Sequence, residues 1–462
     1  MSHQTKTQIR LAAELNETLF NQAHAYGMEY LNEVTTRTVF PSTQAIHNLT
    51  IFDEPLPKDS APATEILELL NEHGAPATVA QMGGRYFGFV SGGSVPAGLA
   101  AKSLATFWDQ SSAMYVQSPL VSVLETVVES WLQEAFGLPH ETVAGFVTGS
   151  SAANFCGLAA ARFRILTTLG WNVNQNGLRN APQVRIVTGR HAHSTVVKAL
   201  MLLGFGKNDI EWVDVDAQGR LIVEKLPPLG ADTILILQAG NVNSGAFDPF
   251  TEINQVVKDS GAWIHIDGAF GLWANASNEL NHHTKGIEFA NSWAVDGHKT
   301  LNTPYDCGIV LCNDRDALTS ALHMVGDYIV YSEQRDGMLY TPDMSRRSRI
   351  IELWATIKSL GKTGMSEMIL NMHRRAVQFA KEINKVEGFA VLNEVVFNQV
   401  MVMCNTDEIT NTVLSKIQQD GVCWAGGSVW FGRKVIRISV CSWVTNEADI
   451  TLSVNSFKKA LE

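Results

Sequence analysis

The sequence predicts an α/β protein built on a mainly parallel sheet, followed by a smaller α+β domain. Two observations predict the sheet. Short β-branched runs recur between residues 143 and 313, and most are separated by stretches long enough for a helix. This alternation is typical of βα units, in which helices cover both faces of the sheet. The runs are Val184–Val187, Trp212–Val215, Thr233–Leu237, Trp263–Ile266, Trp293–Val295 and Ile309–Leu311.

The chain is expected to divide into three parts. Residues 1–82 are predicted to be helical and to serve dimerisation, with a proline-rich break at 53–62. Residues 83–345 form the large α/β domain, and residues 346–462 form the small domain. The large domain begins with long apolar helices between 96 and 136. One buried face is predicted there from the i, i+3, i+4 spacing of Leu120, Val123, Leu124, Val127 and Trp131.

The small domain is predicted to start with a helix from Ile350 to Ser359, which ends at Gly361. Two later stretches, Phe389–Cys404 and Val422–Cys441, have the texture of strands in an antiparallel layer. This α+β domain is expected to close over the sheet.

Composition excludes several classes of function. The formal charge of −11, with no basic stripe, argues against nucleic acid as a partner and favours a small-molecule substrate. No apolar stretch has the ~20 residues of a membrane span, and the first residues lack the apolar core of a signal peptide. The six cysteines have no zinc-like spacing, so we expect no metal site and a cytoplasmic location.

A lysine follows the predicted strand Trp293–Val295. In Asp296-Gly-His-Lys299 it occupies a turn at the carboxyl end of the strand, where parallel sheets bind ligands. Apolar surroundings would lower the pKa of its amine and suit it to form an imine with a carbonyl group. For an isolated His-Lys pair, an exposed loop lysine beside a structural histidine is the commoner outcome.

Asp267 ends the preceding predicted strand. A carboxylate at the end of a buried strand needs a cationic partner, because an unpaired buried charge is costly. A protonated pyridine nitrogen would supply that charge, and a protonated ring accepts electrons from a carbanion. The alternative is an aspartate that caps the next helix.

A phosphate-binding turn is predicted at 146–151, where a strand leads through Gly149, Ser150 and Ser151 into an apolar helix. Free N–H groups and two hydroxyls at a helix start suit a phosphate, although a plain serine cap is the alternative. No G-x-G-x-x-G run or Walker lysine accompanies the turn, which disfavours a dinucleotide or nucleotide triphosphate. His191 or His193 could stack on a planar ring, although an isolated surface histidine is commoner.

With these motifs in order, the sequence resembles the group II pyridoxal-phosphate-dependent amino acid decarboxylases, the aromatic-L-amino-acid and glutamate decarboxylase-like family. The likeness runs from about Gly83 to Val444 and is most specific over Asn291–Gly308, which is similar to the family's cofactor-lysine signature. It implies an aspartate aminotransferase-like (fold type I) architecture with a seven-stranded sheet, and pyridoxal 5′-phosphate as cofactor. It also implies a homodimer with the active site at the interface.

The resemblance implies roles for individual residues. Lys299 would hold the cofactor as a Schiff base, with His298 against its phosphate. Asp267 would bind the pyridine nitrogen, and His193 would stack on the ring. The other implied contacts are Ala269 under the ring, Asn243 near it, and Ser150 and Ser151 at the phosphate.

In many family members a tyrosine on a mobile loop protonates the carbon that loses carbon dioxide. Ser345–Trp354 is similar to the double-arginine helix that follows this loop, and Asp336–Pro342 would be the loop itself. Tyr340, contributed across the dimer, is therefore the expected proton donor. The alternatives are Tyr328, Tyr331 and, from the large domain, His193.

The expected reaction is the decarboxylation of an L-amino acid. An aminotransferase or aldehyde synthase on the same fold is the nearest alternative, because Arg437 lies in a strand that carries a carboxylate-binding arginine in aminotransferases. A non-enzymatic scaffold is disfavoured by the combination of Lys299, Asp267 and His193. The side chains that could receive an aromatic substrate are Phe89, Trp108 and Tyr115.

Overall fold

The computed structural model describes residues 4–323 and 333–462. At its centre is a seven-stranded sheet with the order β1-β7-β6-β5-β4-β2-β3, in which β7 alone runs antiparallel to its neighbours. The predicted α/β class and mainly parallel sheet are confirmed. The strands are β1 (Val143–Val147), β2 (Arg185–Gly189), β3 (Ile210–Val213), β4 (Thr233–Gln238), β5 (Trp263–Asp267), β6 (Ser292–Asp296) and β7 (Gly308–Cys312).

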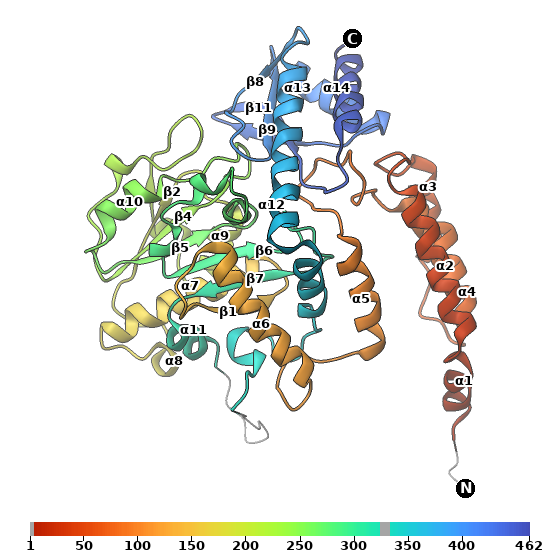
Figure 1. Ribbon diagram of the computed structural model, residues 1–462, viewed down its shortest axis with the longest axis horizontal. Helices are drawn as coiled ribbons and strands as arrows, with labels where there is room; N and C mark the ends of the chain where they lie inside the picture. Colours follow the sequence, from red (N-terminus) through yellow and green to blue (C-terminus); the bar gives the residue numbers. More distant parts are fainter. Residues whose placement is uncertain (1–3, 324–332) are drawn as a thin grey trace.

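Helices cover both faces of this sheet (Figure 1). Successive strand residues point to opposite faces, so Leu235 and Leu237 belong to one apolar cluster and Ile234 and Ile236 to the other. The first cluster includes residues of α6 (Pro119–Phe136) and α10 (Phe250–Val257). The helices that contribute to the second are α7 (Ser150–Thr168), α9 (Ser194–Leu202) and α11 (Arg315–Leu322), with the short α8 (Val173–Asn176) nearby.

The N-terminal segment is helical, as predicted, and lies along one side of the molecule (Figure 1). We call its four helices the N-terminal arm. They are α1 (Lys6–Glu14), α2 (Glu17–Glu33), α3 (Thr43–Asn48) and α4 (Ala63–Leu69), and none of them contains a buried residue. Neither these nor any other helix within 4–323 and 333–462 has the length and apolarity needed to cross a membrane.

The small domain contains the predicted antiparallel layer, a four-stranded sheet of order β10-β11-β9-β8. Its strands are β8 (Phe389–Val391), β9 (Gln399–Cys404), β10 (Gly426–Trp430) and β11 (Arg433–Ser439). Residues of α13 (Asp407–Asp420) and α14 (Glu447–Leu461) pack with this sheet in a third apolar cluster.

One helix joins the two domains. The predicted helix at Ile350 does not end at Gly361 but kinks there, where φ is 59°, and α12 continues to Ile383. Its first half packs in the large-domain cluster through Leu353 and Ile357, and its second half packs in the small-domain cluster. The boundary between the two cores therefore lies inside α12, not at the predicted position between residues 345 and 346.

The predicted buried face of α6 is only partly right. Leu124 and Trp131 pack against the large-domain cluster, but Leu120 and Val123 are 46% and 54% exposed. The fully buried side chains of this helix include Val128, Leu132 and Glu125, which lie outside the predicted set. Leu120 and Val123 are left uncovered, together with exposed side chains at the end of α5 (Pro96–Trp108).

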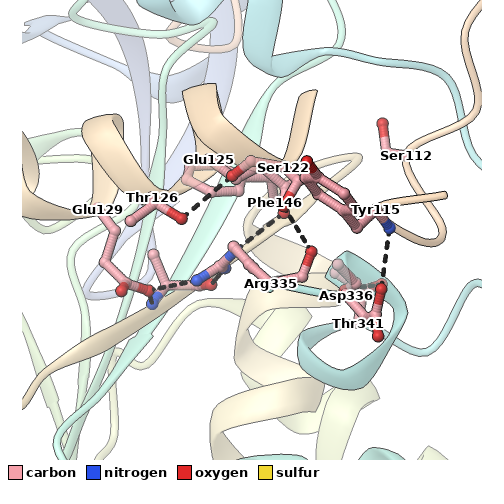
Figure 2. Close-up of polar contacts among 12 residues, drawn as sticks. Ser112, Tyr115, Ser122, Glu125, Thr126, Glu129, Phe146, Arg335, Asp336 and Thr341 are labelled. Carbon is pink, nitrogen blue, oxygen red and sulfur yellow. Dashed lines mark hydrogen bonds and ion pairs between the residues drawn. The ribbon is translucent and has the colours of Figure 1, made fainter. Parts of the chain in front are cut away.

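Glu125 is buried and ion-paired, and Figure 2 shows it with Glu129 and their shared partner Arg335. Arg335 Nε donates to Glu125 Oε2 at 3.0 Å and its Nη1 donates to Glu129 Oε2 at 2.7 Å. Arg346 Nη2 donates to Glu125 Oε1 at 2.8 Å. Ser122 Oγ donates to the carbonyl oxygen of Arg335 at 2.7 Å, so α6 holds both the side chain and the backbone of this residue.

We predict that Glu125→Ala lowers the free energy of unfolding by about 3–5 kcal/mol, because it leaves two buried guanidinium groups without a full set of acceptors. Glu134→Ala is the matched control, since Glu134 and its partner Lys362 are 61% and 73% exposed. That change should cost at most about 1 kcal/mol. Urea titration of both variants measures the free energy of unfolding. Equal losses in the two variants would contradict the stabilising role of the buried ion pairs of Glu125.

Candidate active site

The candidate residues gather where the parallel strands end. Asp267 and Asp296 are the last residues of the paired strands β5 and β6. Three other strands lead into turns that hold candidate residues: β1 into Gly149, β2 into His193 and β4 into Asn243. Because the carboxyl ends of parallel strands meet at one edge of a sheet, five separate segments contribute to one site.

Lys299 forms an ion pair with Asp296, with its Nζ 3.0 Å from Oδ2. Burial by itself lowers the pKa of this amine, but the charge and hydrogen bond of Asp296, followed by the charge of Asp267, raise the pKa above its usual value. The expected lowering of the Lys299 pKa is therefore wrong for the protein without cofactor. Burial acts in the predicted direction, but the two carboxylates outweigh it.

Asp296 is a site residue that the sequence reasoning did not assign. Its side chain is 1% exposed, and its Oδ1 has no hydrogen-bond partner among the described residues. Oδ2 also lies 3.7 Å from His298 Nε2. The available signal was its position as the last residue of a buried strand, which is the signal that identified Asp267.

Asp267 is buried, and its Oδ1 accepts a hydrogen bond from the Ala269 amide at 3.2 Å. Burial raises the pKa of this carboxyl, although the charges of His193 and Lys299 oppose the rise. The Ala269 carbonyl accepts from the Asp296 amide at 2.9 Å and so links the ends of β5 and β6. A cation delivered to the carboxylate would relieve the cost of its burial.

His193 precedes α9 and has a fixed ring. Its Nδ1 lies 2.7 Å from Thr195 Oγ1 and 3.3 Å from the Thr195 amide, and the tautomer that accepts from this amide carries its proton on Nε2. Burial lowers the pKa of His193, and the charges of Asp267 and Lys299 act on it as well, which indicates that the three groups are close. With Asn243 and Arg437, among others, His193 lines a cavity of about 300 Å³.

The turn after β1 has the properties of a phosphate site. No side chain caps α7 at Gly149, so the first N–H groups of this 19-residue helix are left for a ligand. Ser150 is buried and Ser151 is exposed. A methyl group built on Gly149 would lie 3.4 Å from His298 Cε1, so His298 borders the same turn.

Tyr340 is not brought to this site. Its ring is 3% exposed and packs in the cluster with α7 and α11, with the Arg335 guanidinium carbon 4.0 Å from the ring centroid. This packing in its own chain does not support Tyr340 as a donor to a second subunit. The alternatives, Tyr328 and Tyr331, lie outside the described residues.

The three expected substrate-side aromatics have different surroundings. Phe89 is 66% exposed and stacks on Trp424, with ring centroids 5.6 Å apart. Trp108 ends α5 and is 42% exposed. The Tyr115 amide donates to Asp336 Oδ1 at 2.8 Å (Figure 2).

The conserved domain of pyridoxal-dependent decarboxylases matches residues 47–404. The chain belongs to the pyridoxal-dependent decarboxylase family. Tyrosine decarboxylase 2 of Narcissus pseudonarcissus is 24% identical over 426 residues, which cover 85% of this chain and 84% of that protein. The acidic amino acid decarboxylase GADL1 of Mus musculus is 28% identical over 330 residues, which cover 68% of this chain and 59% of that protein.

The fold of this pyridoxal-dependent decarboxylase matches the crystal structure of Oryza sativa TDC with PLP and tryptamine. The TM-score is 0.89 at 22% identity, over 97% of this chain and 98% of that one. The match confirms the expected aspartate aminotransferase-like (fold type I) architecture. The protein is a pyridoxal-phosphate-dependent carboxy-lyase that acts on an amino acid.

The residues present fit the cofactor. The uncapped start of α7 provides donors for a phosphate, and the buried Asp267 carboxylate requires a positive charge such as that of a protonated pyridine nitrogen. Lys299 supplies the amine beside them. The fit therefore rests on two features of this decarboxylase, the uncapped start of α7 and the buried carboxylate of Asp267.

Asp248 supports the loop that holds Asn243. It is buried, and its two carboxylate oxygens accept from the amides of Leu221 and Gln238, each at 2.7 Å. Burial is the largest influence and raises the pKa of Asp248 to about 6. Sequence reasoning did not single out this residue.

We predict that Asp248 makes the stability of this decarboxylase fall as the pH rises. The folded pKa of about 6 exceeds the unfolded value. The contribution of Asp248 is therefore present below about pH 4, and about 3 kcal/mol is lost as the pH rises through about 6. The melting temperature of Asp248→Asn, relative to that of the wild type, should therefore rise as the pH rises over this range. A difference that stays constant with pH would contradict the prediction.

Proposed function

We propose that Lys299, Asp267 and His193 carry out the decarboxylation of an L-amino acid to its amine and carbon dioxide. The observation that carries this proposal is the buried amine of Lys299 between the carboxylates of Asp296 and Asp267. A cytoplasmic location is part of the proposal, supported by six cysteines that are all buried and free.

When bound, pyridoxal phosphate supplies an electron sink for the bond that breaks. Lys299 would hold the cofactor through its amine, and Asp267 would hold a proton on the ring nitrogen. Ser150 and Ser151, at the start of α7, would bind the phosphate. His193, Ala269 and Asn243 would contact the ring.

His193 is our preferred proton donor. In the tautomer whose Nδ1 accepts from the Thr195 amide, Nε2 carries the proton of the neutral ring. The lowered pKa of His193 keeps the ring neutral at physiological pH, so the proton on Nε2 is available to the carbon that loses carbon dioxide. Tyr340 would have to leave its contact with Arg335 to act in this role.

Arg437 is the observation that favours transamination as a second candidate. It lines the same cavity as His193, its Nη1 donates to the Val242 carbonyl at 3.1 Å, and its Nε has no partner among the described residues. A guanidinium group there could bind the carboxylate of a substrate and retain it. A keto acid as product would identify this reaction, and an aldehyde with ammonia would identify an aldehyde synthase.

We predict that the purified protein has the visible absorption band of lysine-linked pyridoxal phosphate and that Lys299→Ala abolishes this band. Lys285→Ala, which changes an exposed lysine, is the control and should retain it. Mass analysis after incubation with a panel of L-amino acids should identify an amine. A band that survives Lys299→Ala, or products other than an amine, would overturn the proposal.

The proposal includes a homodimer. The N-terminal arm buries none of its residues within the chain, and short helices are marginally stable alone. Apolar side chains are exposed on the arm, at the end of α5 and at the start of α6, and Phe20 of the arm is in edge contact with Phe107 of α5. Exposed apolar side chains of this kind suit an interaction site, and a second copy of the chain would cover them.

We predict a solution mass of two chains and a weaker dimer for Val123→Asp, because the substitution would bury an unpaired carboxylate. The dissociation constant should rise at least about tenfold, which corresponds to ~1.4 kcal/mol. Val256→Asp on α10 is the matched control, since Val256 and Val123 are 59% and 54% exposed. Light scattering over a dilution series measures both, and a wild-type mass of one chain would refute the dimer.

A further inference from the structure

Asn302 lies three residues after Lys299 and is fully buried. Its φ is 58°, in the left-handed region that asparagine adopts more readily than most residues. Glycine would adopt this backbone at less cost, so the backbone alone does not account for a side chain here. The contacts of the side chain do.

The amide group of Asn302 joins three segments that are distant in the sequence. Its Oδ1 accepts from the Gly93 and Trp443 amides, both at 2.9 Å. Its Nδ2 donates to the carbonyl oxygens of Lys299 at 2.9 Å, Thr300 at 3.1 Å and Cys441 at 2.8 Å. Backbone donors lie on one side and carbonyl acceptors on the other, so one orientation of the amide satisfies all five contacts.

The segments that meet at Asn302 surround the lysine. Gly93 belongs to the loop that also carries Phe89, and Trp443 follows β11 of the small domain. The loop passes so close to Lys299 that a methyl group on Gly92 would collide with the Lys299 carbonyl oxygen. The Gly92 amide donates to the His298 carbonyl at 3.3 Å. Asn302 therefore fixes the backbone of Lys299 against both the early loop and the small domain.

We propose that Asn302 is a positioning residue for the reaction, which acts by holding the main chain of Lys299 and so sets the direction of its amine. The inference rests on the proposed role of Lys299. A buried amide with all of its hydrogen-bonding groups in use has little freedom to move. The turn that carries Lys299 is held by this amide and is therefore restricted as well. Leucine, serine or aspartate at this position would lose the donors to Lys299 and Thr300.

Two variants separate the contacts. Asn302→Gly tolerates the left-handed backbone and removes all five hydrogen bonds. Asn302→Asp keeps acceptors for Gly93 and Trp443 but replaces the donors to Lys299, Thr300 and Cys441 with an oxygen. If Asn302→Gly fails to fold, Asn302→Asp still tests the inference. The control is Asn398→Ala, which removes a fully buried amide whose Nδ2 donates to Val440 within the small domain at 3.0 Å.

The readout is the visible circular dichroism of the lysine-linked cofactor, because this signal depends on how the lysine holds the ring. We expect both Asn302 variants to bind cofactor, to lose at least about half of the dichroism per absorbing group, and to shift the pH midpoint of the band. With the amino acid identified in the product screen, kcat should fall about 10- to 100-fold while KM changes little, since misplacement by about 1 Å has effects of that size. Asn398→Ala should keep the wild-type dichroism, pH midpoint and kcat even if its melting temperature falls.

Wild-type dichroism and pH midpoint in Asn302→Asp would overturn the positioning role. Equal spectral changes in Asn398→Ala would also overturn it, because they would reflect a general loss of stability. Failure of the underlying proposal is distinguishable, since the band would then persist in Lys299→Ala whatever the Asn302 variants do.

Discussion

The ion pair between Lys299 and Asp296 is the contact around which the candidate site is arranged. It exists because β5 and β6 lie side by side and end together, which brings two carboxylates and one amine to the same edge of the sheet. The negative charges of Asp296 and Asp267 are close to balanced only when the positively charged groups of several segments are counted together. Asp267 has no ion-pair partner among the described residues, and a positively charged ring nitrogen would relieve the cost of its burial.

The backbone that holds these groups is itself tied to distant elements. Arg346 and Arg349 each donate to the Phe146 carbonyl at 3.2 Å and so fix β1 just before the turn at Gly149. Arg347 pairs with Asp306, which follows Tyr305, and Tyr305 stacks on His298 with ring centroids 4.3 Å apart. The segment that begins α12 therefore supports both the turn at Gly149 and the turn that carries Lys299.

The strands and the main site residues were predictable because each depends on local order in the sequence. Buried β-branched runs identified the sheet, and Asp267 and Lys299 were found because they end or follow such runs. The buried face of α6 was only partly predictable from periodicity, since ion pairs with distant arginines also decide which side chains turn inward. Gly361 was a poor stop signal because the apolar pattern resumes after the kink.

Other features of the site depend on contacts that no local pattern records. The pKa of Lys299 rises because carboxylates from two strands meet it, so the same sequence context in a different topology would have lowered it. Asn302 and Gly93 are 209 residues apart, and nothing near either residue indicates the other. The resemblance to a decarboxylase family pointed to Lys299 as the lysine proposed to hold the cofactor, but the arrangement around it required the folded chain.

The continuity of α12 has a consequence for how the molecule comes apart. Its first half is part of the large-domain core and its second half is part of the small-domain core, with Gly361 as a bend and not a break. Disorder in either core removes one end of a helix on which the other core depends. We therefore expect the two domains to unfold together, and we expect a small domain cut from the large one to lose its fold.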